Sequence, residues 1–204
     1  YARGLGYPLV FDDASLTEEF LRAYAGPFHL DLRRLAYGSF GLTYASFGFD
    51  IPWLRLGNAL LHAAASVLLF RLGLRLLAAL VPDLPLARRR AAAFAGAAVF
   101  ALHPVAVYAV AYLMQRSIVM ATAFSLAALA CFLEGLLRGR VAWHLAAVAA
   151  YACAVFSKEH AVMLPAVALA MAVLVRTPSW RLARELALPL GLMGAVAVGI
   201  VLLQ

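Results

Sequence analysis

Long apolar stretches dominate the pattern of hydrophobic and polar positions. Six apolar segments follow one another at 53–75, 91–112, 117–137, 141–156, 161–175 and 185–203. Four of them approach or exceed the roughly 20 residues that cross about 30 Å of hydrocarbon. Segments 141–156 and 161–175 are shorter, and only Ser157-Lys158-Glu159-His160 separates them, so we expect a tight helical hairpin with a polar tip. The pattern predicts an all-α fold, a polytopic transmembrane bundle of about six helices over residues 53–204.

Residues 1–52 have a different pattern. The run Ser15-Leu16-Thr17-Glu18 matches a helix-capping box, and an apolar face follows it through Phe20, Leu21 and Tyr24. Aromatic residues then recur from Phe28 to Trp53, as is typical of a boundary between membrane and water. Polar residues at the start and glycines further on interrupt the region too often for a standard span. We expect a non-cytoplasmic outer loop that carries a short amphipathic helix on the membrane surface.

Composition supports a membrane protein. Of 204 residues, 66% are hydrophobic and only 13% are charged, which excludes an ordinary soluble domain. Cys131 and Cys153 both lie in apolar stretches, so packing explains them better than a disulfide or a metal site. The net charge of +7 does not indicate nucleic acid, because the arginines lie between apolar runs. The chain begins at Tyr1 and ends within an apolar run, as expected of a fragment truncated at both ends.

The positive residues predict an orientation. If 53–75 runs from outside to inside, the two short outer loops hold only Arg116 and Lys158, whereas the inner side receives ten arginines. This is the positive-inside pattern. The ten are Arg71, Arg75, Arg88, Arg89, Arg90, Arg138, Arg140, Arg176, Arg181 and Arg184. Five N-terminal arginines (Arg3, Arg22, Arg33, Arg34 and Arg55) weaken the contrast without reversing it.

This topology gathers distant charged residues on the outer side: Asp12, Asp13, Arg116 and the Lys158-Glu159-His160 tip. Such a group suits an anionic lipid headgroup and a proton-accepting carboxylate. Each residue also has a structural interpretation. Adjacent aspartates form solvated turns, and arginine or lysine at a helix end extends toward lipid phosphates. The remaining alternatives are a local Lys158–Glu159 ion pair, a helix kink at His103-Pro104, and hydrogen bonds between helices by Asn58 and His62.

Five short sequence motifs follow one another along residues 9–170. They are Phe11-Asp12-Asp13, the run RRLAYGSFGLTY at 33–44, the run GNALLH at 57–62, the pair FALHP at 100–104 with YLMQRS at 112–117, and Ser157-Lys158-Glu159 with Leu164-Pro165. In this order they resemble the GT-C superfamily of membrane glycosyltransferases, and most closely the tetratricopeptide-containing protein O-mannosyltransferases and their bacterial relatives. Two positions depart from that family: Arg34 replaces the usual proline, and Tyr108 stands where relatives tend to carry glutamate.

The resemblance implies transfer of a hexose such as mannose from a polyprenyl-phosphate donor to a hydroxyl of a protein or glycan. The reaction would take place on the outer, periplasmic side of a bacterial inner membrane. In this interpretation Asp13, or its neighbour Asp12, is the base that accepts the proton of the hydroxyl. Arg116 and Lys158 contact the lipid phosphate. Glu159, His103, Arg33 and His62 support them, and a divalent metal cofactor is left open.

Two other functional classes fit the same charges. A transporter or flippase of an anionic lipid or lipid-linked sugar would bind it without chemistry, although transport sites tend to lie near the midplane of the membrane. A structural membrane subunit would scaffold a partner, and it predicts no clustering of Asp13, Arg116 and Lys158.

Overall fold

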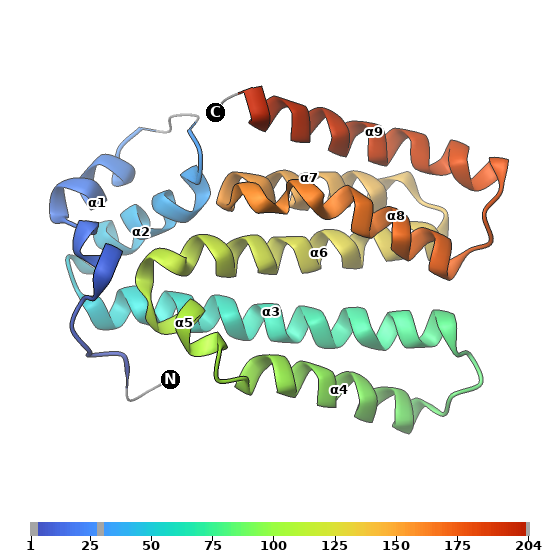
Figure 1. Cartoon of the computed structure of the whole chain (residues 1–204), viewed down its shortest axis with the longest axis horizontal. Coiled ribbons are helices and arrows are strands. Elements are labelled where there is room, and N and C mark those ends of the chain that lie inside the picture. The colour runs from blue at the N-terminus through green and yellow to red at the C-terminus, as the bar shows by residue number, and fades with distance from the viewer. Residues whose placement is uncertain (1–3, 28–30, 203–204) are drawn as a thin grey trace.

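The computed structural model describes residues 4–27 and 31–202, and within these ranges the chain forms helices and turns but no strands. The N-terminal part contains η2 (Phe11–Ser15), α1 (Glu18–Ala25) and α2 (Arg34–Phe47). The remainder contains α3 (Ile51–Leu80), α4 (Leu86–Leu102), α5 (Ala106–Ala111), η3 (Leu113–Gln115), α6 (Arg116–Arg138), α7 (Val141–Ser157), η4 (Glu159–Met163), α8 (Leu164–Val175) and α9 (Trp180–Leu202). Figure 1 shows the long helices running side by side, up and down, with α1 and α2 at one end. The all-α prediction is confirmed.

Among the described residues, three stretches of helix are long and apolar enough to cross a membrane: Ile51–Leu80, Leu113–Arg138 and Trp180–Leu202. They contain the predicted segments 53–75, 117–137 and 185–202, and Leu203 lies outside the described residues. Many large apolar side chains on the surface of the bundle are exposed, such as Leu60 on α3, Phe94 on α4 and Val198 on α9. Extensive exposed apolar surface is typical of contact with lipid or with another membrane helix.

The predicted span 91–112 is wrong as a single helix. It divides at His103-Pro104, where α4 ends at Leu102 and α5 begins at Ala106. Proline has no backbone N–H and forces the preceding residue out of the helical region, and His103 accordingly has φ −60° and ψ 131°. The His103 ring accepts a hydrogen bond at Nδ1 from the Val105 N–H (3.3 Å), so this histidine shapes the turn between the two helices.

The N-terminal region contains more helix than predicted. The cap of α1 is Thr17, whose Oγ1 accepts from the Phe20 N–H (3.2 Å), whereas Ser15 donates its hydroxyl hydrogen to the Asp12 carbonyl (2.6 Å). The capping box is therefore not centred on Ser15. The second helix, α2, was not predicted, because glycines interrupt its sequence. Phe28, which began the predicted aromatic belt, lies outside the described residues.

Two apolar cores hold these parts together. The larger lies among α3, α6, α7, α8 and α9 and includes the fully buried Phe132 and Tyr151. The smaller joins the N-terminal elements to the bundle, and its members are Leu16, Leu21, Phe40, Leu54 and Leu113. Because Leu54 belongs to α3 and Leu113 to η3, this second core fixes α1 and α2 against one end of the bundle.

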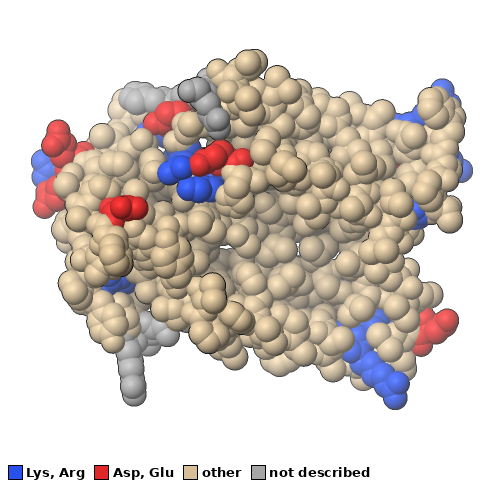
Figure 2. Space-filling model, in the orientation of Figure 1, with Lys and Arg blue, Asp and Glu red and all other residues tan. Residues whose placement is uncertain are grey.

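The two ends of the bundle carry different charge. The arginine-rich end, formed by the connections 81–85, 139–140 and 176–179 and the adjoining helix turns, holds the ten arginines predicted for the inner side against three acidic residues, a balance of +7. The α1–α2 end, formed by η2, α1, α2, η3 and η4 with the adjoining turns, holds six described cations against seven acids. Arg3 lies outside the described residues. Figure 2 shows charge at both ends and a wide uncharged band between them.

Candidate functional site

Asp13 is buried at the α1–α2 end and anchors η2 to η3. Its Oδ2 accepts from the Leu113 N–H (3.0 Å) and its Oδ1 from the Met114 N–H (2.9 Å). Free backbone N–H groups at the start of a helical turn favour a carboxylate. Burial nevertheless raises the pKa of the Asp13 carboxyl, and the amides of Met114 and Leu113 oppose that rise. Asp13 therefore holds the turn that leads directly into α6.

Asp12 lies next to it but faces the surface. Its side chain is exposed, and its backbone N–H donates to the Tyr112 hydroxyl (3.0 Å). The two aspartates therefore lie in different environments, Asp13 buried and Asp12 exposed, and the catalytic difference between them stays a prediction. The preference for Asp13 as the base needs correction, because both oxygens of its carboxylate are engaged by backbone amides inside the protein. Of the pair, Asp12 carries the solvent-exposed carboxylate.

Arg116, the first residue of α6, is only 2% exposed. Its guanidinium lies over the Phe40 ring, 3.8 Å from the centroid, and Nε donates to Asn58 Oδ1 (2.8 Å). Its other acceptors are the Leu54 carbonyl and the hydroxyls of Ser39 (3.3 Å) and Thr43 (3.4 Å). Within the described part of the chain no carboxylate contacts it. Arg116 thus joins α2, α3 and α6 through neutral partners, and a phosphate cannot reach it in this conformation.

Gly57 makes room for this arginine. A Cβ atom at position 57 would lie 2.7 Å from Arg116 Nη2 and 3.2 Å from Cζ, so only glycine fits there without a shift. One turn along α3 from Asn58, the buried His62 places Nε2 3.2 Å from the Ala101 carbonyl. Asn58 and His62 therefore link α3 to neighbouring helices, as their structural interpretation predicted.

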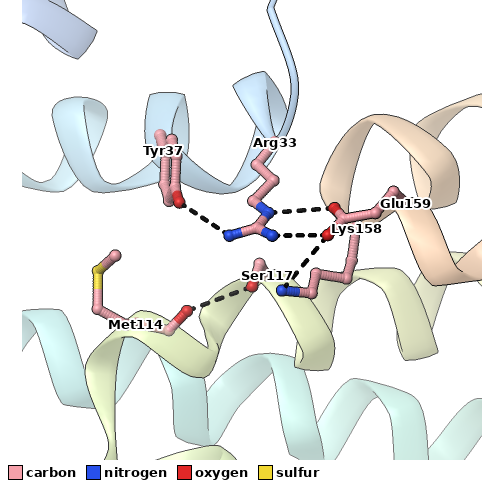
Figure 3. Close-up of polar contacts among 6 residues, drawn as sticks. All are labelled: Arg33, Tyr37, Met114, Ser117, Lys158 and Glu159. Carbon is pink, nitrogen blue, oxygen red and sulfur yellow. Dashed lines mark hydrogen bonds and ion pairs between the residues drawn. The ribbon is translucent and has the colours of Figure 1, made fainter. Parts of the chain in front are cut away.

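The Arg33–Glu159–Lys158 cluster lies where the N-terminus of α2 meets the hairpin tip between α7 and α8 (Figure 3). Arg33 binds Glu159 through two parallel bonds, Nη2 to Oε1 (2.6 Å) and Nε to Oε2 (3.1 Å). Lys158 Nζ lies 3.8 Å from Glu159 Oε1, and Arg33 Nη1 also donates to the Tyr37 hydroxyl (3.4 Å). The side chains of Arg33 and Glu159 are 34% and 31% exposed, so the cluster is open to solvent on one side.

The electrostatics of this cluster favour an anion. The Arg33 guanidinium lowers the pKa of the Glu159 carboxyl to about 2, so Glu159 stays ionised and is a poor proton acceptor. Two cations against one carboxylate leave a net positive charge at the surface. Arg33 also has a left-handed backbone (φ 60°, ψ 17°), which costs a residue other than glycine about 1–2 kcal/mol. Such a cost is typical of functional positions that the surrounding structure fixes.

Sequence reasoning missed several residues of this region. Ser39 and Thr43 bind Arg116, but they lie on α2, which was not predicted. Arg55 was considered only as a topological charge; it is buried and donates to the carbonyls of Ala111 (3.0 Å) and Pro8 (2.9 Å), and also to the Tyr7 carbonyl. The only sequence signal for the buried role of Arg55 was its position as a single arginine near the start of an apolar helix.

The five sequence motifs are joined at the α1–α2 end by side-chain hydrogen bonds. Asp13 connects the first motif to 112–117, Arg116 connects that motif to Asn58 and to α2, and Arg33 connects α2 to Glu159. The carboxylate of Asp13 contacts neither Arg116 nor Lys158 within the described residues. His103 is exposed, and its ring accepts a hydrogen bond from the Val105 N–H in its own turn.

Metal ligands are not grouped here: in residues 4–27 and 31–202 no three His, Cys, Asp or Glu side chains come together. Comparison with protein-family models, with curated proteins and with solved structures found no match to this chain.

Proposed function

We propose that this chain is part of a membrane glycosyltransferase of GT-C type. It transfers a hexose, with mannose the first candidate, from a polyprenyl-phosphate donor to a hydroxyl of a protein or glycan. The observation that supports the proposal is the hydrogen-bonded assembly of all five motifs at the α1–α2 end. The expected clustering of Asp13 with Arg116 and Lys158 is not part of this assembly, because the Asp13 carboxylate binds the amides of Leu113 and Met114 instead.

In the proposed mechanism Asp12 is the general base. It accepts the proton of the acceptor hydroxyl while that oxygen attacks the anomeric carbon. The bond between the anomeric carbon and the phosphate oxygen breaks, and the lipid phosphate leaves with the electron pair. Lys158 and Arg33 stabilise the charge that develops on this phosphate, because they are the partly exposed cations of the site.

Arg116, Asp13 and Glu159 act as positioning residues in this scheme. Asp13 holds the η3 turn, Arg116 holds α2 against α3 and α6, and Glu159 fixes the guanidinium of Arg33. The proposed topology is polytopic, with the arginine-rich end in the cytoplasm and the α1–α2 end at the outer, periplasmic face of a bacterial inner membrane.

A donor screen tests the proposal. Purified full-length protein is incubated with polyprenyl-phosphate mannose, glucose or galactose and a peptide acceptor, with and without a chelator, and release of the lipid phosphate is followed by mass spectrometry. Release that depends on the acceptor supports the enzyme. Movement of a labelled donor across proteoliposomes without any release would instead identify a transporter or flippase.

Matched variants test the site. Lys158→Gln should lower turnover, whereas Arg140→Gln, which removes the same charge at the arginine-rich end, should not. Asp12→Asn should reduce turnover by roughly 10²–10⁴-fold with unchanged thermal stability, as expected for loss of a general base. Asp13→Asn should lower thermal stability, because an amide oxygen replaces a carboxylate that accepts two backbone bonds. Normal turnover in a folded Asp12→Asn protein would contradict the assignment of the base.

A further inference from the structure

A polar cavity lies at the opposite end of the bundle from the candidate site. It has a volume of about 860 Å³, opens at the arginine-rich end and is bounded mainly by the first turns of α7 and α9. Its charged and titratable lining consists of His144, Arg176, Arg181, Arg184 and Glu185. None of these residues belongs to the five motifs or to the proposed mechanism.

His144 is the central feature of this cavity. It is only 4% exposed, and its ring lies against the backbone of Gly135, where a Cβ would come within 2.7 Å of Nδ1. The edge of the ring packs against Phe132, with centroids 5.3 Å apart. Neither ring nitrogen has a hydrogen-bond partner within the described part of the protein. A buried imidazole with two unpaired nitrogens costs free energy unless a bound group satisfies it.

Glu185 faces His144 with an unpaired oxygen of its own. Oε2 accepts from Arg176 Nη1 (2.7 Å), whereas the buried Oε1 has no hydrogen-bond partner among the described residues. Oε1 lies 3.8 Å from His144 Nε2, which is too far for a direct hydrogen bond. Both atoms are enclosed, so a shift of the His144 or Glu185 side chain would be needed to admit a hydroxyl that donates to the carboxylate and accepts from the ring.

Arg181 and Arg184 supply positive charge at the rim. On α9, Arg181 lies four residues before Glu185 and Arg184 lies directly before it. Both arginines line the cavity, and their side chains are exposed. Within the described ranges neither forms an ion pair or a hydrogen bond through its side chain. Three exposed apolar residues, Trp180 (76%), Val141 (56%) and Leu188 (51%), lie in or beside the same opening. Cations for a phosphate thus adjoin an apolar surface for acyl chains.

We propose that this cavity binds the headgroup of an anionic phospholipid that carries a free hydroxyl, of the phosphatidylglycerol type. Arg181 and Arg184 bind the phosphodiester, and the headgroup hydroxyl lies between His144 and Glu185 Oε1. The apolar rim favours a membrane lipid over a soluble phosphate ester, because acyl chains would cover it. The site serves lipid recognition at the face opposite the proposed catalytic end, so it stands independently of the proposed function.

Lipid retention on the full chain tests the proposal. The protein is reconstituted in phosphatidylcholine nanodiscs that contain either phosphatidylglycerol or phosphatidylethanol, extracted gently, and examined by native mass spectrometry. Phosphatidylethanol has the same phosphodiester charge but no hydroxyl. We expect retention of phosphatidylglycerol to exceed that of phosphatidylethanol several-fold. Equal retention of the two lipids by the unaltered protein would overturn the proposal without any variant.

Two double variants separate the cavity from general surface charge. Arg181→Gln with Arg184→Gln should lower retention of phosphatidylglycerol about tenfold or more, because two charge-assisted contacts are lost. The control is Arg88→Gln with Arg90→Gln, which removes two exposed arginines at the same end on α4 and should reduce retention much less. Equal losses in the two variants would show only non-specific attraction and overturn the site.

A soluble competitor distinguishes the two sources of this chemistry. Glycerol 3-phosphate carries a phosphate monoester and free glycerol hydroxyls without acyl chains. It should not raise the thermal unfolding midpoint of the detergent-solubilised protein, whereas phosphatidylglycerol should, and Arg181→Gln with Arg184→Gln should remove that rise. A rise with glycerol 3-phosphate that the same double variant abolishes would identify a soluble ligand and contradict the lipid assignment.

Discussion

The fit of Arg116 against Gly57 gives the sharpest test of the α1–α2 end. In the Gly57→Ala variant the added methyl group would lie 2.7 Å from Nη2, whereas an ordinary contact begins at 3.4 Å. The guanidinium would therefore have to move by about 0.7 Å. Arginine ends usually move freely, but this one is enclosed by the Phe40 ring and by hydrogen bonds to Asn58 and the Leu54 carbonyl.

Two opposing effects decide the outcome. Replacing glycine by alanine inside a helix normally stabilises it by about 1 kcal/mol. Losing one hydrogen bond to a charged group costs about 1.5–3 kcal/mol. The net expectation for Gly57→Ala is a loss of roughly 0.5–2 kcal/mol in the free energy of unfolding. The matched control is Gly73→Ala on the same helix, where the new methyl would meet the Ala93 side chain at 3.7 Å, an ordinary contact.

The measurement is the unfolding of the purified full-length protein in mixed micelles, with thermal midpoints as a second readout. We expect Gly73→Ala to unfold at the same or a higher midpoint than the unaltered chain and Gly57→Ala at a lower one. If both alanine variants stabilised the protein equally, Arg116 would not be confined as described. The account of how α2 is held to the bundle would then fail.

Two further outcomes follow from the structure. Because Arg33 lowers the pKa of Glu159 from 4.5 to about 2, the ion pair stabilises the fold above pH 4.5, and this contribution is lost as the pH falls toward 2. The unfolding midpoint of the Arg33→Gln variant should therefore vary less with pH over that range. A pH dependence equal to that of the unaltered protein would exclude the ion pair as its source. In a cysteine-free background, single cysteines at Asp83 and at the hairpin tip should label from opposite sides of the membrane, with the tip outside. Ser157 is buried, so the exposed His160 is the better tip position, and labelling of both positions from one side would refute the topology.

Apolar length was enough to predict most of the bundle. The segments 53–75 and 117–137 appear inside α3 and α6, and the predicted hairpin tip matches the boundary between α7 and η4. A run of about 20 apolar residues has few alternatives to a helix, since unpaired backbone groups are costly in an apolar environment. The break at His103 was harder to place, because the residues on both sides of it are equally apolar and only the proline marks it.

The candidate site was predicted less well, since it depends on contacts distant in sequence. The helix α2 contains two glycines, and its stability comes from the burial of Phe40 and from the bonds to Arg116. The roles of Asp12 and Asp13 were inferred from an extended segment, in which neighbouring side chains point to opposite faces. The structure instead has a 3₁₀ turn there, and contact with Leu113 and Met114 decides which carboxylate is buried.

The uneven charge of the two ends has an electrical consequence. With the arginine-rich end in the cytoplasm, its balance of +7 lies on the negative side of the membrane potential. Moving one charge across about 100 mV involves about 2.3 kcal/mol, so inverting the bundle would cost about 16 kcal/mol against the voltage alone. In the proposed topology, an energised membrane therefore favours the orientation with the arginine-rich end in the cytoplasm. If the proposed topology and donor are right, the α1–α2 end meets only lipids of the outer leaflet, so a donor made in the cytoplasm has to be moved across the membrane before it is used.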